Sequence, residues 1–259
     1  MNIQISELGK TYVTRGGERI EALRDVSASI DSGEFVTVIG PSGCGKSTML
    51  DILAGLTPAS AGTASIGGTE VGDASLRPGL VFQRSVLLPW RTALENVLLP
   101  AQVGRHRSAP GDGRKEVRQK AEDLLDLVGL GPFSAKYPWE LSGGMQQRVA
   151  IARALLLETH VMCLDEPFAA LDEFTREQMH LEFLRIWASQ RFTTVFVTHN
   201  VFESVFLSDR VLVMSPRPGR IVADVPIDLA RPRQREMIGS DSFATNLRRV
   251  REAMREFWD

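Results

Sequence analysis

The sequence predicts an α/β fold with a mostly parallel central sheet, an N-terminal antiparallel β layer and an inserted helical subdomain. Short apolar runs recur along the chain, at residues 34–40, 79–83, 161–167, 193–200 and 210–215. They are rich in β-branched and large apolar residues and do not alternate, which is typical of strands covered on both faces. Two further observations complete the prediction: alternating segments open the chain, and a helix-rich stretch interrupts the apolar runs.

The N-terminal layer is predicted from alternation. Residues 2–8 and 20–30 alternate in strand fashion around the turn-rich residues 14–19, and residues 63–68 add a short strand. Between them, the apolar run 34–40 enters a glycine loop. A helix is expected to follow over residues 46–56 and to end at Gly55.

The inserted subdomain is expected at about residues 88–155, within a domain of residues 1–230. Residues 116–130 form an amphipathic helical pattern that stops at Gly129, and residues 92–103 are a second helical candidate. The apolar face of the first helix is predicted to carry Val117, Ala121, Leu124, Leu125 and Val128.

Residues 231–259 are predicted to form a polar segment followed by an amphipathic helix. Its apolar positions are Phe243, Leu247, Val250, Met254 and Phe257, and arginines occupy the other faces. Such a helix either touches a membrane surface or packs on its own domain with a solvated charged face; the second is the more common role.

The composition argues against several classes of protein. The 259 residues are 43% hydrophobic and 24% charged, which is ordinary for a chain that buries a full core. The net charge of −2 gives no overall basic field, so we expect no nucleic-acid partner. We find neither a signal-peptide pattern nor an apolar run of about 18 residues, so any membrane crossing must come from another chain. Two cysteines do not make a disulfide framework and favour a reducing cytosol.

A phosphate-binding loop is the strongest motif. Residues 40–48, "GPSGCGKST", match the Walker A pattern of P-loop NTPases, and the pattern follows a predicted strand and opens a helix. The loop N–H groups are expected to surround the β-phosphate of ATP. Lys46 supplies positive charge to the β- and γ-phosphates, and the Ser47 hydroxyl can ligate Mg²⁺.

Two acids end the apolar run at 161–165. Ligands of parallel sheets bind at the carboxyl ends of strands, so Asp165 and Glu166 are expected to reach the phosphate loop. Asp165 would hold Mg²⁺, and Glu166 would orient and deprotonate the attacking water. Cys163 is predicted to be inert core, whereas Cys44 in the phosphate loop is expected to be exposed when no nucleotide is bound.

A second anion site is predicted at residues 141–148, "LSGGMQQR". The Ser142 hydroxyl can cap a helix, Gly143 and Gly144 let a phosphate approach the backbone, and the helix dipole favours negative charge. One domain would therefore carry two anion-binding helix starts about a hundred residues apart.

The order of these motifs resembles the ATPase subunits of ABC transporters. "GPSGCGKST", Gln83, "LSGGMQQRVAIARAL", "VMCLDEP", "ALD" and "VTHN" follow one another as they do in that family, over nearly the whole chain. The resemblance implies a head-to-tail dimer in which the Walker A loop of one copy and the Ser142–Gly144 loop of the other hold one ATP. Each chain would then carry both halves of a site but could close neither alone.

The resemblance also assigns further residues. Tyr12 resembles the aromatic that stacks on adenine, and Gln83 the glutamine that meets Mg²⁺ and the water. Asp172 resembles the acid that signals across the dimer, and His199 the histidine that contacts the γ-phosphate. Asn200 departs from the usual aspartate. The full expected set of ATP-contacting residues is Tyr12, Gly40, Pro41, Ser42, Gly43, Cys44, Gly45, Lys46, Ser47, Thr48, Ser142, Gly143, Gly144, Gln146 and Asp172; Glu166, His199 and Gln83 are expected to be catalytic, and Ser47, Gln83 and Asp165 to bind Mg²⁺.

Shorter and less specific motifs indicate the kind of transporter. "LLPWRTALENV", "DEPFAALDEFTR" and "FLSDRVLVMSPRPGRI" look like the ATPases of bacterial nitrate, sulfonate and taurine importers. This resemblance implies a peripheral subunit at the cytoplasmic face of the inner membrane, with membrane permease subunits and an extracytoplasmic solute-binding protein as partners. Neutral or cationic metabolite precursors are also carried in this family. The alternative is a soluble ABC ATPase acting on a nucleic-acid or protein complex.

The segment after Gln83 separates these alternatives. In the family it receives the cytoplasmic helices of the membrane subunits, and here it carries Leu87, Leu88 and Trp90. These side chains either meet such a partner or anchor the helical insertion internally.

Overall fold

The computed structural model describes residues 1–73, 76, 78–103, 112–157 and 159–255. The chain divides into two compact units. The first contains Met1–Pro78, His160–Asp165 and Trp187–Asp259, and the second contains Gly79–Thr159 and Glu166–Ile186. None of the helices in the described part of the chain combines the length and the apolar character needed to cross a bilayer.

The antiparallel layer of the first unit confirms the prediction from alternation. Its strands are β1 (Ile3–Val13), β2 (Arg19–Ile30), β4 (Ala61–Ile66) and β5 (Thr69–Glu70), in the spatial order β2-β1-β4-β5. Ile3 pairs with Ile30 on one side and with Ile66 on the other, and all three are buried. The alternating apolar residues therefore face the core of this unit.

The second sheet of the first unit is mostly parallel, as the apolar runs predict. Its strands are β3 (Phe35–Ile39), β7 (Val161–Asp165), β8 (Thr193–Thr198), β9 (Arg210–Met214) and β10 (Ile221–Pro226), in the order β10-β9-β3-β8-β7. Every residue of β3 and β8 is buried, which explains why neither strand alternates. Among these five strands, only β10 runs antiparallel to its neighbour, at the edge beside β9.

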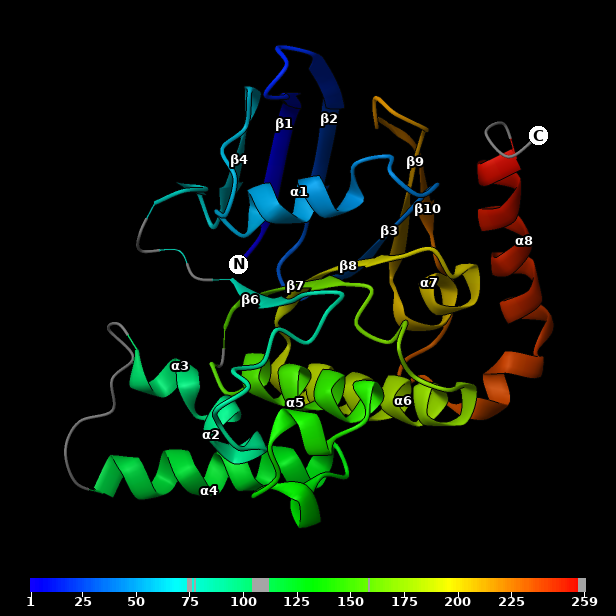
Figure 1. Ribbon diagram of the computed structural model, residues 1–259. Helices are drawn as coiled ribbons and strands as arrows, with labels where there is room; N and C mark the ends of the chain where they lie inside the picture. The colour runs from blue at the N-terminus through cyan, green and yellow to red at the C-terminus, as the bar shows by residue number, and fades with distance from the viewer. Residues whose placement is uncertain (74–75, 77, 104–111, 158, 256–259) are drawn as a thin grey trace. The chain divides into compact units, whose positions relative to one another are not determined.

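Helix α1 (Lys46–Leu53) lies between the two sheets of the first unit and contacts strands of both (Figure 1). It ends where predicted: Gly55 adopts a φ of 72° and donates its N–H to Ile52 O. A left-handed residue just beyond a helix terminates it, and glycine adopts this conformation without a Cβ penalty.

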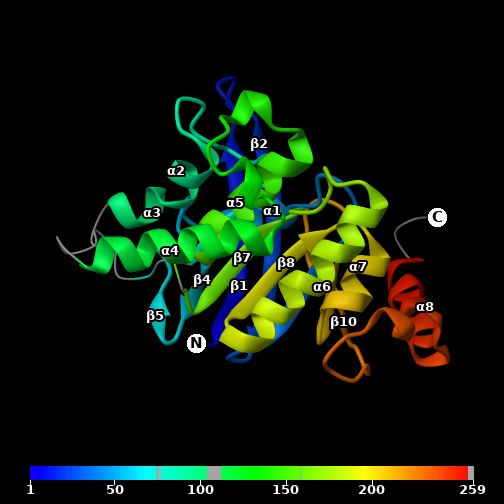
Figure 2. The ribbon, with the colours of Figure 1, turned by 90° about the horizontal axis from the view of Figure 1, so that it is seen from below.

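The C-terminal helix α8 (Asp241–Arg255) follows the short η4 helix (Arg235–Gly239) and packs beside α7 (Val201–Leu207), as Figure 2 shows. Phe243 of α8 contacts Phe202 of α7, with ring centroids 5.1 Å apart. Phe243, Val250 and Met254 are buried, while the arginines of α8 are exposed. The apolar face is therefore occupied by its own domain; the position predicted for Phe257 lies outside the described residues.

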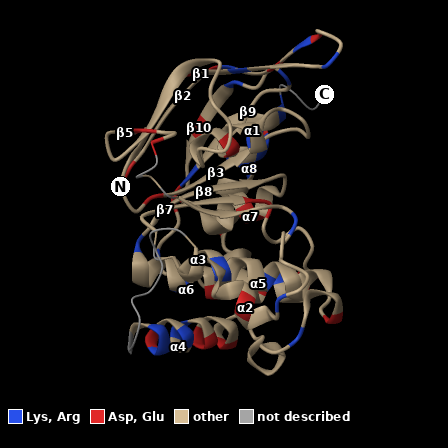
Figure 3. Cartoon of the chain, turned by 60° about the vertical axis from the view of Figure 1, so that its left-hand side comes forward, with Lys and Arg blue, Asp and Glu red and all other residues tan. Residues whose placement is uncertain are grey.

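The second unit is largely helical. It contains β6 (Gly79–Val81), α2 (Ala93–Val97), α3 (Leu99–Gln102), α4 (Asp112–Leu127), η2 (Gly131–Phe133), η3 (Pro138–Glu140), α5 (Gly143–Leu155) and most of α6 (Glu173–Gln190). Helix α4 packs on α5 and buries Ala121, Leu124 and Leu125, as its pattern predicts. Basic and acidic residues are interspersed on its outer side (Figure 3).

Two details differ from the sequence prediction. Residues 92–103 form two helices and not one, because Pro100 has no N–H to continue the hydrogen-bond ladder of α2. Strand β10 was not predicted; it is a short edge strand that ends in a proline, and Val225 is its only buried residue.

Candidate functional site

The carboxyl ends of three parallel strands bring predicted site residues to one edge of the sheet in the first unit. Ile39 of β3 pairs with Thr198 of β8, and Val197 of β8 pairs with Asp165 of β7. Gly40 and His199 directly follow Ile39 and Thr198. The phosphate loop, His199 and Asp165 therefore leave the sheet side by side, where parallel α/β sheets bind ligands.

The glycines of the phosphate loop are required by close packing. A Cβ on Gly40 would lie 2.8 Å from Met214 O, and one on Gly45 would lie 2.7 Å from Ala22 O. Gly43 and Gly45 also adopt positive φ values of 76° and 107°. Such a loop turns successive N–H groups toward one point and creates an anion-binding concavity before α1.

The side chain of Lys46 is hydrogen-bonded to the start of the phosphate loop. It is buried, and its Nζ donates hydrogen bonds to Gly40 O at 2.8 Å and Pro41 O at 2.9 Å. The side chain thus lies back across the loop that it follows. Ser47, the next residue of α1, is exposed, so its hydroxyl is available to a ligand.

Tyr12 lies beside the same helix. Its hydroxyl is 3.5 Å from Thr48 Oγ1, and the Nζ of Lys10 lies 5.0 Å from the centre of its ring. The side chain is 38% exposed. A half-exposed ring next to a phosphate loop can stack on a nucleobase, whereas a core tyrosine would be buried.

His199 is exposed in the turn between β8 and α7. Asn200, where an aspartate is usual, caps α7: its Oδ1 accepts hydrogen bonds from the N–H groups of Phe202 and Glu203. Thr198 Oγ1 accepts the N–H of Asn200 and donates to Glu203 Oε2. Asparagine therefore preserves the cap that orders this turn.

In the second unit, Glu166 and Gln83 lie together. The Nε2 of Gln83 is 3.2 Å from Glu166 Oε2, a hydrogen bond between residues 83 positions apart. Glu166 adopts a φ of 45°, which is uncommon for a residue with a Cβ. Strained backbone of this kind concentrates at active sites, where surrounding structure holds it in place.

The second predicted anion site also forms within this unit. Ser142 caps α5 by accepting the N–H of Met145 at 3.3 Å, and it is exposed. A Cβ on Gly144 would meet Leu171 Cδ2 at 3.0 Å, so the Ser142–Gly144 loop packs against the loop that carries Asp172.

Asp172 caps the N-terminus of α6, as Ser142 caps that of α5. Its Oδ1 accepts the N–H of Thr175 at 3.0 Å at the start of α6. This hydrogen bond lowers the pKa of the Asp172 carboxyl, so the side chain is ionised at neutral pH.

Helix α5 also holds the segment that follows β6, a feature that the sequence analysis missed. Gln147 Nε2 donates to Phe82 O at 2.8 Å, and Arg153 donates to Val86 O at 2.9 Å. Gln146, predicted to contact ATP, uses its side chain inside the unit: Oε1 accepts from Ser85, and Nε2 donates to Pro138 O and Leu141 O. No sequence spacing signals these contacts, because the partners are mostly backbone carbonyls.

One prediction about the cysteines was wrong. Cys44 is buried, with 1% of its surface exposed, because Gly40 packs against its Sγ and Gly219 packs against its backbone. Burial raises the pKa of its thiol. Cys163 is the inert core residue that was predicted: it is fully buried, and burial raises the pKa of its thiol to about 12.

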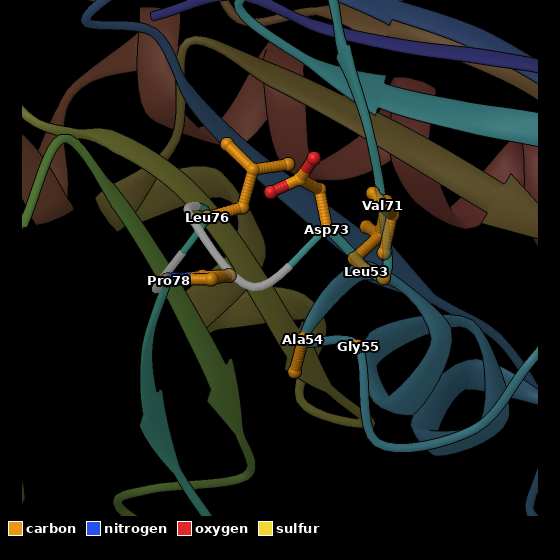
Figure 4. A pocket seen from close by; sticks show the side chains of 8 residues that line it. Leu53, Ala54, Gly55, Val71, Asp73, Leu76 and Pro78 are labelled. Atoms are coloured by element: carbon orange, nitrogen blue, oxygen red, sulfur yellow. The ribbon is translucent and has the colours of Figure 1, made fainter. Parts of the chain in front are cut away.

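A cavity of about 260 Å³ lies at the C-terminal end of α1, the end opposite to Lys46 (Figure 4). None of the predicted site residues lines it. Its walls are formed by Leu53, Ala54, Gly55, Val71, Gly72, Asp73, Leu76 and Pro78.

Comparison with known proteins supports the family suggested by the motifs. The model of the family described as ABC transporter matches residues 23–169. An aliphatic sulfonates import ATP-binding protein of Bacillus licheniformis is 43% identical, covering 85% of this chain and 83% of that protein. A taurine import ATP-binding protein of Rhizobium johnstonii is 42% identical, over 88% of this chain and 85% of that protein. A nitrate import ATP-binding protein of Synechococcus elongatus is 41% identical, over 93% and 86%.

The fold agrees with solved ATP-binding cassettes. A dimeric cassette in a post-hydrolysis state, bound to ADP and Pi, superposes with a TM-score of 0.79 and 33% identity. The match covers 88% of this chain and all of that one. The P-loop NTPase fold is thereby confirmed. Since the family model spans more than half of the chain and the relatives share over 40% identity across most of its length, this protein belongs to the ABC transporter family and is an ABC-type ATPase.

Proposed function

We propose that this chain is the ATP-hydrolysing subunit of a bacterial ABC importer that takes up a small oxyanion, a sulfonate such as taurine or else nitrate, through a separate membrane permease. The observation that carries the proposal is the similarity to import ATP-binding proteins for sulfonates, taurine and nitrate, at 41–43% identity over more than four fifths of each chain. The site geometry supports the ATPase part of the proposal independently.

The first unit supplies the nucleotide contacts. The N–H groups of residues 43–46 would surround the β-phosphate, and Lys46 would shift from the carbonyls of Gly40 and Pro41 toward the β- and γ-phosphates. Tyr12 would stack on the adenine, since its half-exposed ring lies beside Thr48.

The residues present fit a magnesium ion. Ser47 offers an exposed hydroxyl on α1, and Asp165 offers a carboxylate at the end of β7, the strand against which α1 packs. The described residues contain no group of three or more His, Cys, Asp or Glu side chains able to hold a metal. This suits Mg²⁺, which binds through one or two carboxylates, water and substrate phosphates. Bound Mg²⁺ would neutralise charge on the β- and γ-phosphate oxygens.

The second unit supplies the base. Glu166 would accept the proton of the attacking water, and Gln83, which is hydrogen-bonded to it, would orient both the carboxylate and the water. His199 would donate a hydrogen bond to the γ-phosphate from the end of β8. Charge developing on the phosphoryl oxygens would be stabilised by these donors and by Lys46.

Each site would be completed by a second copy of the chain. The exposed Ser142 hydroxyl and the first N–H groups of α5 suit the γ-phosphate of a nucleotide held by the partner copy. Asp172 lies on the loop packed against Gly144, which suits a role in signalling across the dimer. The similar cassette bound to ADP and Pi is described as dimeric.

The permease would bind the segment after Gln83. Val86 and Trp90 expose 58% and 68% of their surfaces, whereas Leu87 and Leu88 are half-buried. Apolar anchors of this kind typically fill pockets on a partner. The segment is joined to α5 through Arg153, which donates to Val86 O and Ser85 O, so movement of the permease contact would be transmitted to the Ser142 loop.

Two experiments test this function. First, the chain should co-purify with membrane permease subunits at the cytoplasmic face of the membrane; recovery with ribosomes or nucleic acid instead would favour a soluble ABC ATPase. Second, a solute-binding protein encoded beside this chain should bind taurine, alkanesulfonates or nitrate. Tight binding of a thiamine-precursor pyrimidine, with no response to the oxyanions, would overturn the substrate assignment and leave the ATPase assignment intact.

A further inference from the structure

A hairpin joining β9 to β10 packs directly on the phosphate loop. Its residues, 215–220, read SPRPGR. A Cβ on Gly219 would overlap the carbonyl oxygen of Cys44, so only glycine permits this approach. Met214, the last residue of β9, approaches Gly40 in the same way, with its carbonyl oxygen 2.8 Å from the position of a Cβ. The two backbones are therefore in contact at both ends of the hairpin.

The hairpin is fixed in this position by hydrogen bonds. Gly219 donates its N–H to Ala22 O and accepts the N–H of Arg24, both at 3.0 Å, which attaches the hairpin to β2. Ser215 closes it internally, because its hydroxyl donates to Pro216 O and accepts the N–H of Arg220. The side chain that this hairpin presents to the phosphate loop therefore extends from a backbone that is fixed relative to the loop.

Arg217 is that side chain. Its Nη2 lies 3.8 Å from the position that a Cβ on Gly43 would occupy, which places the guanidinium beside the middle of the phosphate loop. The residue is exposed, and within the described part of the chain its guanidinium forms no ion pair. The neighbouring Arg220, by contrast, faces Asp25, with Nη2 3.9 Å from Oδ2. Arg217 therefore adds an uncompensated positive charge at the rim of the loop.

We propose that Arg217 binds the phosphate chain of the nucleotide, as a second cation beside Lys46. This inference rests on the proposed binding of ATP at the phosphate loop. Lys46 lies buried under the loop, whereas Arg217 reaches it from outside, so the two charges would contact the phosphates from different directions. The planar guanidinium suits this role, because its N–H groups match phosphate oxygens in pairs and it stays charged at all relevant pH values.

The test is nucleotide affinity of the isolated chain at concentrations where it is monomeric. Arg217→Ala should raise the Kd for ATP about tenfold, which corresponds to about 1.4 kcal/mol. Arg217→Lys should recover part of the loss, since it keeps the charge but not the paired donors. The matched control is Arg220→Ala, which removes an exposed arginine from the same hairpin and should change the Kd less than twofold. The salt dependence of the Kd should also be weaker in Arg217→Ala than in the wild type, which a purely structural role would not produce.

The outcomes distinguish this inference from the proposed function. An unchanged Kd in Arg217→Ala, while Lys46→Ala loses binding, would overturn the role of Arg217 and leave the nucleotide site standing. Unchanged affinity in both variants would overturn the site itself. An unchanged Kd with loss of ATP-driven dimerisation would show that Arg217 meets the partner copy and not the phosphates. Equal melting temperatures of the Arg217→Ala and Arg220→Ala variants would exclude misfolding as the cause of a loss.

Discussion

The side-chain amide of Gln83 donates a hydrogen bond to the carboxylate of Glu166, with Nε2 and Oε2 3.2 Å apart. The two residues come from the end of β6 and the end of β7, and Glu166 is held in a left-handed conformation. Gln83 is followed by the segment that Arg153 attaches to α5, and Gln147 of α5 holds the preceding residue, Phe82. The proposed base is thus connected through one side chain to the segment proposed to meet the permease.

Glu166→Gln should lower ATP turnover by about 10² to 10⁴, since loss of a general base typically costs this much. Nucleotide affinity should persist, because the substitution leaves the phosphate loop unchanged. The variant should accumulate as an ATP-bound dimer on a sizing column. Glu116→Gln on the exposed side of α4 is the matched control and should turn over ATP normally. Normal turnover by Glu166→Gln would remove Glu166 from its role.

Mixed dimers test whether Ser142 acts on the nucleotide of the partner copy. Ser142→Arg and Lys46→Ala should each abolish ATP-driven dimerisation when every chain carries the change. A mixture of the two variants should dimerise, because one composite site then combines both defects and the other has neither. Differently tagged chains, co-purified with ATP, give the measurement. If the mixture dimerised as poorly as either variant alone, Ser142 would not act on the nucleotide of the partner copy.

Trp90→Ala should weaken assembly with the permease and leave basal ATPase activity of the isolated subunit close to normal. The side chain is 68% exposed, so its loss removes an apolar anchor without opening a core cavity. Trp139→Ala is a matched control, since Trp139 is 67% exposed and belongs to the same unit. If the two variants weakened assembly equally, the segment after Gln83 would not be the contact site of the permease.

Asn96→Ala should destabilise the second unit. Asn96 is fully buried; its Oδ1 accepts the N–H of Leu88, and its Nδ2 donates to Leu88 O, Arg91 O and Thr92 O. Its removal leaves the N–H of Leu88 and the carbonyl of Arg91 without these partners, whereas Leu88 O and Thr92 O keep the N–H groups of Arg91 and Asn96. We expect a cost of about 1–3 kcal/mol in the free energy of unfolding. Urea denaturation measures the change, and the exposed Gln119→Ala should stay within about 0.5 kcal/mol. A neutral Asn96→Ala would mean that water replaces the side chain.

The parallel strands and motif positions could be predicted because they depend on local pattern: β3 is apolar at every residue since both of its faces are covered. Strand β10 could not, because an edge strand exposes one side and shows no apolar run. The burial of Cys44 could not be predicted either, since Gly219, which packs against its backbone, is 175 residues away in the sequence. Contacts made to backbone carbonyls, such as those of Gln146 and Arg153, leave no sequence signal of their own.

The two thiols should resist modification until the chain unfolds. Burial raises the pKa of Cys163 from an ordinary value of 9.0 to about 12, and burial also raises that of Cys44. Burial therefore lowers the thiolate fraction of both residues and also limits the access of a reagent to their sulfur atoms. Titration with a disulfide reagent should find no rapidly reacting thiol in the native chain and both in denaturant, with Cys44→Ala and Cys163→Ala isolating each signal. The same shift makes stability depend on pH. Below pH 9.0 the stability associated with protonated Cys163 is fully present; as pH rises toward 12, the unfolded chain releases a proton that the folded chain retains, and stability falls. Rapid labelling of the Cys163→Ala variant would show that Cys44 opens to solvent in the native state, contrary to its burial.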